Sequence, residues 1–565
     1  RSLYERSADG FFWIAFYRYV FSFDPNRPEE VAVKYEVGVS EMVATPAAAF
    51  QRQERNVYES SRLSDIPFPT TILEKRGRLV LGGIDGFALD TGQVSIKVAI
   101  NADSLRFVSL FLPYILKLDS LFYDGNPVDF HRRHDFDFVG VVLPEYCYRG
   151  DTVDFTFWYH GKKYDLFLPY VEDPRPCLHD FIFVVPASYS YYVSGMGEMQ
   201  FEDGGRKTFE VKSSNQYREF YFHAYASDID TIPLKTSSGI PLNVLRSRHL
   251  SKRMLTGCFV PDEKFRESVV GAFNHMTSYL GRPINTFVEY VVPERHRSMP
   301  GLIMVPQTSC AMEAPLATLG DFDLVAGIEV GKQWFGSLMR PAGDRECWLT
   351  EAAPRFLGLL HVQNKQGPVY LGNLIVRRDS LYKEIDRGHD MPLAAGSRVN
   401  TTILRNKGIW LLHMLRFHMF DPETQSESKF LRFLLELAIL CNTKTYTNSD
   451  IQTLAEKHYG ADLGWFFDQW LYGRNLPEFD VEYRFESSGD GYTVRVAVET
   501  KGAPEQFSTP VIMRVSFADG SREHFRETAA ATETEFTLGP FDKEPQEFFF
   551  NEFLGVLSRD KVKKR

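Results

Sequence analysis

The spacing of hydrophobic residues changes twice along this chain. Up to about residue 245 apolar and polar positions alternate, as in residues 30–40 and in the run that contains Val94, Ile96, Val98 and Ile100. A period of two is typical of strands with one buried face. This region predicts an antiparallel sheet domain over residues 79–245, preceded by a β extension over residues 1–78.

From about residue 246 to residue 475 the spacing becomes helical. The first apolar series ends at a glycine stop, Gly281, and consists of Phe265, Val269, Phe273, Met276 and Leu280. Such positions share one face of a helix. Further helices are predicted over residues 324–338, 403–420, 430–441, 450–458 and 462–472. Ser449 or Asn448 is the expected N-cap of the fourth of these.

Alternation returns in the last part of the chain. Tyr492, Val494, Val496 and Val498 share one strand face, and Asp519-Gly520 fits a tight hairpin turn. We therefore predict a β-sandwich over residues 476–565. The whole chain of 565 residues is expected to be a multidomain α+β protein, since a single core rarely grows so large.

Composition narrows the classes of function. The net charge is −10, and the basic tail Arg559–Arg565 is expected to be a frayed end, so no nucleic acid partner is indicated. No apolar run reaches the length of roughly 18 residues that a membrane span needs. Six cysteines without C-x-x-C spacing indicate neither a disulfide scaffold nor a zinc site. The chain begins at Arg1 without a signal peptide, which indicates processing or truncation.

One stretch carries the spacing of a metal site. In zinc peptidases H-E-x-x-H places two histidines one helical turn apart, the glutamate between them is the general base, and a later carboxylate is the third ligand. Here Ile328 and Lys332 stand at the two histidine positions. Glu329 stands at the base position, and Glu351, nineteen residues after Lys332, at the third-ligand position.

Three flanking segments accompany this motif. They are Cys310-Ala311-Met312-Glu313-Ala314, Arg405-Asn406-Lys407-Gly408 with His413-Met414-Leu415-Arg416, and the run from Trp465 to Gly473. In order and spacing these segments resemble the gluzincin zinc aminopeptidases, the family of aminopeptidase N, over roughly residues 80–475. The resemblance implies an N-terminal β-saddle domain, a mostly helical thermolysin-like domain and a C-terminal β-sandwich.

The same resemblance shows where the chain departs from the family. Arg405 stands at the position of the tyrosine that stabilises the tetrahedral intermediate, and Ala314 replaces the asparagine of the exopeptidase loop. Glu313 matches the glutamate that holds the substrate's α-amine. Pro354 follows Glu351 closely and is expected to lie in a first helical turn.

These substitutions predict the loss of the metal. Isoleucine has no lone pair, and Lys332 beside Glu329 and Glu351 is expected to stay charged, so no zinc or other cofactor is expected. We hypothesise that Lys332 bridges Glu329 and Glu351 where the metal would lie, with Arg405 adding a second positive charge. The alternative is that Lys332 points into solvent.

Three functions follow from this interpretation. The first is a catalytically inactive aminopeptidase-like protein with a protein or peptide partner, serving in binding or as a subunit of an envelope- or surface-associated, extracytoplasmic assembly. The second is an active metallo-aminopeptidase with atypical ligands such as His361 or His389. The third is a binder of peptide N-termini, favoured by Glu313 and weakened by Ala314.

Other histidines give weaker signals. His131 and His134 could belong to a metal loop, although a solvated turn is the preferred interpretation. His413 is predicted to be a packed residue of its helix.

Overall fold

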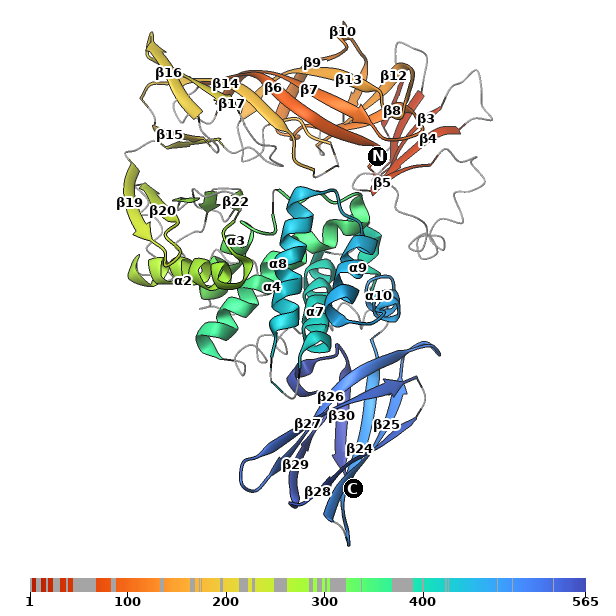
Figure 1. The fold of residues 1–565 in the computed structure, drawn as a ribbon. Helices are drawn as coiled ribbons and strands as arrows, with labels where there is room; N and C mark the ends of the chain where they lie inside the picture. The colour runs from red at the N-terminus through yellow and green to blue at the C-terminus, as the bar shows by residue number, and fades with distance from the viewer. Residues whose placement is uncertain are drawn as a thin grey trace.

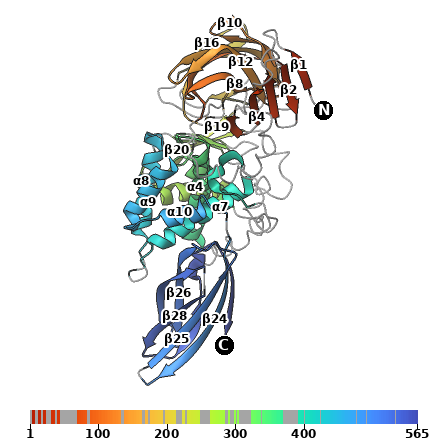
Figure 2. The same cartoon turned by 90° about the vertical axis from the view of Figure 1, so that its right-hand side faces the viewer.

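A computed structural model shows three successive parts: sheets at the N-terminal end, a helical middle and a C-terminal sandwich (Figures 1 and 2). This is the expected multidomain α+β architecture. The structure describes residues 3–6, 12–16, 19–23, 31–36, 39–43, 68–82, 88–132, 137–162, 168–171, 173, 175–188, 190–193, 197–212, 222–225, 229–247, 262–283, 288–291, 297–299, 302–304, 322–336, 338–367, 390–398, 401–421, 424, 426–474, 476–489, 491–531 and 533–565.

The N-terminal part is built mainly from antiparallel strands, but the strands over residues 70–82 and 178–186 of its largest sheet pair in parallel, which corrects the prediction of a wholly antiparallel domain. Its first described sheet contains β1 (Leu3–Arg6), β2 (Phe12–Phe16), β3 (Tyr19–Phe23), β4 (Val31–Glu36) and β5 (Val39–Val43). The largest sheet has the order β10-β9-β13-β7-β6-β14-β17-β16, with bounds β6 (Thr70–Gly82), β7 (Ala88–Ile100), β9 (Leu116–Tyr123), β10 (Asn126–Pro127), β13 (Thr152–Lys162), β14 (Leu178–Pro186), β16 (Gly197–Asp203) and β17 (Arg206–Lys212).

Smaller sheets complete this part. One has the order β11-β12-β8, with β8 (Ser104–Phe111), β11 (Phe130–Arg132) and β12 (Phe138–Tyr148), and another pairs β15 (Ser190–Val193) with β18 (Phe222–Tyr225). The alternating residues Val94, Ile96, Val98 and Ile100 are buried in β7, as the sequence pattern predicts. Residues 30–40, by contrast, form two paired strands, β4 and β5.

A mixed sheet leads into the helical middle. It has the order β19-β20-β21-β23-β22, with β19 (Ile229–Lys235), β20 (Pro241–Ser247), β21 (Val288–Val291), β22 (Arg297–Met299) and β23 (Leu302–Met304). The described helices are α2 (Asp262–Leu280), α3 (Phe322–Gly331), α4 (Cys347–Gln366), α7 (Thr401–Met419), α8 (Ser428–Thr443), α9 (Asn448–Tyr459) and α10 (Gly464–Trp470), with short 3-10 turns η3 (Asp344–Glu346), η4 (Leu393–Arg398) and η5 (Glu552–Leu554).

Several helix ends differ from the predictions. Helix α3 ends at Gly331, well before residue 338, because turns follow it directly. The N-cap of α9 is Thr447, whose hydroxyl and backbone exchange hydrogen bonds with Asp450 in a capping box, so neither Asn448 nor Ser449 has that role. The glycine stop of α2 is confirmed, since Gly281 has a φ of +68°.

Pro354 also contradicts its prediction. Helix α4 begins at Cys347, so Pro354 lies in the helix interior, where it cannot donate a hydrogen bond to the preceding turn. It is buried beside α3: a Cβ on Gly331 would lie 3.1 Å from the Pro354 carbonyl oxygen. Tertiary packing of the α3–α4 pair therefore offsets the local cost of the proline.

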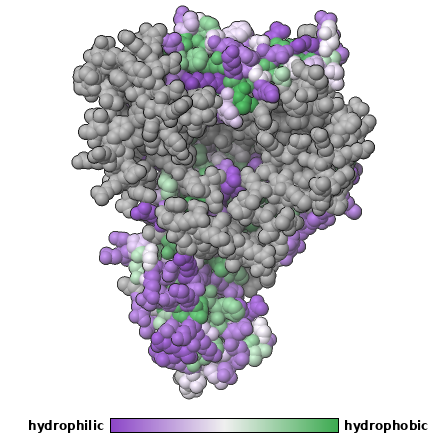
Figure 3. Space-filling model, turned by 180° about the vertical axis from the view of Figure 1, so that it is seen from behind, coloured by the Kyte–Doolittle hydropathy of each residue, from purple (hydrophilic) through white to green (hydrophobic). Residues whose placement is uncertain are grey.

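The C-terminal part is a sandwich of two described sheets. One has the order β28-β25-β24-β30 and the other β27-β26-β29, with bounds β24 (Glu478–Ser488), β25 (Gly491–Lys501), β26 (Ser508–Phe517), β27 (Arg522–Ala530), β28 (Thr534–Phe541), β29 (Pro545–Phe549) and β30 (Arg559–Lys564). The predicted hairpin at Asp519-Gly520 is present between β26 and β27. From behind, the described surface of this sandwich is mainly hydrophilic (Figure 3).

The basic tail is not a frayed end, contrary to the prediction. Strand β30 pairs in parallel with β24, so that Arg559 lies opposite Glu478 and Lys561 opposite Asp480. Both pairs are ion pairs, at 3.2 Å and 3.8 Å. The positive charges of the tail are thus used within the sandwich.

The sandwich and the helical middle share one hydrophobic core. Buried residues of α7, such as Leu415, belong to the same cluster as Val481 and Val515 of the sandwich. The large N-terminal sheet has a separate core of its own. The helices and the sandwich are therefore expected to unfold together, since removing either one exposes the core of the other.

Close helix packing gives the first testable expectation. A Cβ on Gly358 would lie 2.8 Å from Ile328 Cγ1 and 3.0 Å from the Ile328 backbone nitrogen. Gly358→Ala should therefore push α3 away from α4 and lower the free energy of unfolding by about 1–3 kcal/mol in urea titration. Gly489→Ala is the matched control, because nothing lies within 4 Å of an added Cβ there. Equal stability of the two variants would contradict the close approach.

Candidate functional site

The residues of the predicted metal site come from three helices that pack against one another. Helix α3 carries Ile328 and Glu329, α4 carries Glu351, and α7 carries Arg405. Helices α3 and α4 touch at glycines, and on the other side of α4 a Cβ on Gly408 of α7 would lie 2.6 Å from the Ala352 Cβ. Small residues therefore bring the three backbones close together, and Arg405 of α7 forms an ion pair with Glu351 of α4.

Lys332 lies just beyond the end of α3 and still follows its helical path. Its backbone N–H donates to the Ile328 carbonyl oxygen at 3.2 Å. Its ammonium donates to both carboxylate oxygens of Glu329, at 2.8 Å and 3.0 Å. The Glu329 side chain is only 1% exposed and that of Lys332 25% exposed, so the lysine neutralises a buried carboxylate from the more open side.

Glu351 is held by two arginines. Arg405 Nε and Arg355 Nη1 each donate to Glu351 Oε2 at 2.9 Å, and Arg355 also donates to the Glu351 carbonyl oxygen. Burial by itself would raise the pKa of this carboxyl. The charges of Arg355, Arg405 and Lys332 outweigh burial and hold the pKa of Glu351 below its usual range.

The bridge hypothesis is therefore right for one carboxylate only. Lys332 pairs with Glu329 as expected and does not point away from it. The ion pairs found for Glu351 in the described part of the chain are with Arg355 and Arg405, and none joins it to Lys332. Arg355 is a site residue that the sequence analysis missed. Its position one helical turn after Glu351 was the available signal.

Ile328 contributes no polar atom to this site. Its side chain lies over the α4 backbone at Gly358, where the two helices approach most closely. A histidine at the same position would have to leave this contact to direct a ring nitrogen toward Glu351.

A zinc ion does not fit this set of residues. Ile328 has no donor atom, the Lys332 ammonium is occupied by Glu329, and the Glu351 carboxylate is occupied by two guanidinium groups. Over the described ranges, no group of three or more His, Cys, Asp and Glu side chains is arranged to hold a metal. The charges that a metal would balance are balanced here by fixed side chains.

The buried lysine Lys407 joins α7 to the segments at Asp390 and Gly473. Lys407 donates to both Asp390 carboxylate oxygens and to the carbonyl oxygens of Met391 and Gly473. Burial lowers the pKa of Lys407, and the Asp390 charge opposes this effect. Because Lys407 is two residues from Arg405, these four contacts fix the start of α7 and with it the Arg405 backbone.

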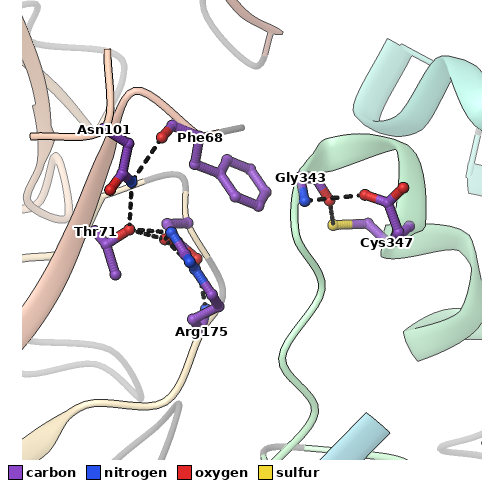
Figure 4. Close-up of polar contacts among 8 residues, drawn as sticks. Phe68, Thr71, Asn101, Arg175, Gly343 and Cys347 are labelled. Atoms are coloured by element: carbon purple, nitrogen blue, oxygen red, sulfur yellow. Dashed lines mark hydrogen bonds and ion pairs between the residues drawn. The ribbon is translucent and has the colours of Figure 1, made fainter. Parts of the chain in front are cut away.

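The N-terminal sheet faces the beginning of α4 (Figure 4). On the sheet side, Asn101 donates to the Thr71 hydroxyl at 2.7 Å and to the Phe68 carbonyl oxygen at 2.8 Å, and Arg175 donates to Asp173. On the helix side, the Gly343 N–H donates to Glu346, the residue before α4. Each side is thus held by hydrogen bonds of its own.

Other predicted site residues fall into two groups. His413 is buried in α7 as expected, with Nε2 within 3.1 Å of the Phe553 carbonyl oxygen. His131 is buried in strand β11, so the solvated turn predicted for it is wrong. The remaining predicted residues lie outside the described residues; they are Cys310, Glu313, Ala314, His134 and His389.

Known structures share this architecture. No protein-family model matches the sequence, and no curated protein matches it. The structure of Legionella pneumophila aminopeptidase A in complex with aspartic acid matches with a TM-score of 0.66 and 12% identity, over 89% of this chain. This chain spans 60% of the length of the Legionella protein.

Two further matches come from Deinococcus radiodurans. Its M1 zinc metallopeptidase matches with a TM-score of 0.53 and 17% identity, over 74% of this chain and 97% of that protein. A mutant of that enzyme bound to a Tyr-Ser-Ala substrate matches equally well at 16% identity. The fold of this chain is thus the fold of M1 zinc aminopeptidases, as the sequence motifs predict.

The Lys332–Glu329 pair can be tested by a double-mutant cycle. Lys332→Met removes the cation from a carboxylate that is 1% exposed, so the free energy of unfolding should fall by about 3 kcal/mol. Glu329→Gln in the same chain should recover most of that loss, because no charge then remains buried. Lys501→Met, which breaks an exposed pair with Asp480, is the control and should cost less than about 1 kcal/mol. A double variant no more stable than the single one would argue against the pairing.

The lowered pKa of Glu351 predicts a pH dependence. A carboxyl whose pKa is lower in the folded than in the unfolded state stabilises the fold above its unfolded pKa. That contribution disappears as the pH falls through the folded pKa. Glu351→Gln should therefore flatten the acid limb of a plot of unfolding free energy against pH, below about pH 4.5, relative to the parent. Parallel curves for the two proteins would mean that the arginines do not stabilise the charged form.

Proposed function

We propose that this chain is a catalytically inactive protein of the M1 aminopeptidase fold, which acts by binding a protein or peptide partner. The observation that carries the proposal is the pairing of Lys332 with Glu329 and of two arginines with Glu351. A general base must accept a proton from water, and a carboxylate held by a lysine at 2.8 Å is a poor acceptor. Without a metal the site also lacks the group that would polarise the peptide carbonyl.

An active enzyme with substitute ligands is less well supported. His361 is on α4, but roughly three helical turns, about 15 Å along the axis, beyond Glu351. It is buried against His275 of α2, with ring centres 5.8 Å apart. His361 therefore faces a different helix and does not supply a ligand beside Glu351.

A role as a subunit of a larger, extracytoplasmic or envelope-associated assembly is the second part of the proposal. Sheet domains flank the helical middle at both ends and offer separate faces to partners (Figure 2). None of the described helices is long and apolar enough to cross a membrane. Light scattering with native purification is the measurement, and a strict monomer without partners would count against this role.

The inactivity is tested by metal content and peptidase assays together. The parent should hydrolyse no aminoacyl substrate with added zinc, and Glu351→Gln should leave its zinc content unchanged. Ile328→His/Lys332→His with Arg405→Tyr restores two imidazoles and releases Glu351 from one arginine. That variant should retain one more zinc ion per chain than the parent.

Each outcome has a distinct meaning. Turnover by the parent that disappears in Glu351→Gln would overturn the proposal. Failure of the histidine variant to gain zinc, with an unchanged unfolding midpoint, would show that the helices no longer hold ligand geometry. In that case inactivity would follow from backbone displacement as well as from side-chain loss.

A further inference from the structure

The strongest unexplained feature lies between α2 and α4, away from Glu351. His275 and Tyr279 follow each other by one helical turn on α2, and their ring centres are 5.2 Å apart. His361 reaches toward them from α4, with its ring centre 5.8 Å from that of His275. The His275 ring thus lies beside both the Tyr279 ring and the His361 ring.

Several polar atoms of these side chains lack a partner among the described residues. His275 Nδ1, the Tyr279 hydroxyl and both ring nitrogens of His361 are buried without a hydrogen-bond partner there. His361 is only 2% exposed. Folded proteins satisfy nearly all buried polar atoms, and an unsatisfied one is destabilising. Four such atoms in one cluster call for a common partner beyond the described side chains.

The separation of the two imidazole rings suits a shared metal ion. Zinc binds imidazole nitrogen at about 2.0–2.1 Å, so two rings that share one ion have centres about 5–6 Å apart.

The surroundings leave room for this contact and a route to it. A side chain on Gly271 would meet the His361 ring at 3.6 Å, so the glycine lets the ring lie against α2. His275 is only partly buried, which gives access from the outer side of α2. The basic residues whose charges act on these side chains are paired: Lys264 and Lys365 with Asp323 and Glu267, and Arg416 with Glu427.

We propose that His275, His361 and Tyr279 form a binding site for one divalent transition-metal ion. The two imidazoles are the principal ligands, and the Tyr279 oxygen is the third protein donor. Imidazole nitrogen favours zinc, copper, nickel and cobalt over magnesium and calcium. This site is separate from Ile328, Lys332 and Glu351. The proposal of a metal site here therefore does not depend on whether the chain is inactive as a peptidase.

The test uses Co²⁺ added to the full chain after chelator treatment, followed by visible absorption and thermal unfolding. We expect one Co²⁺ per chain, displaced by Zn²⁺, and a rise in the unfolding midpoint because the ion binds only the folded state. His275→Gln and His361→Gln should each raise the Kd at least tenfold, and Tyr279→Phe should raise it less. His524→Gln, which also removes a partly buried ring without a partner on Nε2, is the matched control and should leave the Kd unchanged.

The outcomes separate this proposal from the preceding one. Ile328→His/Lys332→His with Arg405→Tyr should add a second ion without changing the affinity of the first. Co²⁺ binding that is absent in the parent, or unchanged in His275→Gln, would overturn the site and leave water as the partner of these atoms. If His361→Gln does not fold, His275→Gln decides, because its side chain is only partly buried.

Discussion

The geometry of the central site depends on keeping two carboxylates charged between closely packed helices. Glu329 is almost completely buried, and an unneutralised charge there would cost several kcal/mol. The positive charge of a metal ion can offset that cost, and so can the positive charges of basic side chains. In this chain Lys332 and Arg405 approach from α3 and α7, and Arg355 approaches from the turn after Glu351. The basic residues thus preserve the helix packing while occupying the atoms that would bind a metal.

The close approach of the helices is the second half of this constraint. The 2.9 Å ion pair of Arg405 with Glu351 joins α7 to α4, which requires these two helices to lie close together. Glycines at positions 327, 331, 358 and 408 make this possible, since an added Cβ at any of them would crowd a neighbouring helix. Lys407 donates hydrogen bonds to Asp390 and to two carbonyl oxygens. These contacts hold the first half of α7, and with it the Arg405 backbone, in place.

Much of the fold could be predicted because its signals are local. Period-two alternation located β7, helical spacing located α2 and α7, and Asp519-Gly520 located the hairpin. Errors arose where distant residues decide the outcome. Pro354 is tolerated inside α4 because α3 packs against it, and the basic tail becomes β30 because β24 presents acidic residues to it. The error at α9 was local: the helix begins at Asn448, two residues before the predicted start, so Thr447 is the N-cap through Asp450.

The sequence by itself determined which residues stand at the positions where the resembling family has its zinc ligands. Ile328 and Lys332 stand at the two histidine positions, and an isoleucine side chain has no donor atom for a metal. Only the tertiary structure decided how the remaining charges pair, because ion-pair geometry depends on where three helices meet. In the structure Lys332 forms an ion pair with Glu329, and Arg355 and Arg405 form ion pairs with Glu351. The tertiary structure also brought His275, Tyr279 and His361 together from helices far apart in the chain, a convergence that no local pattern encodes.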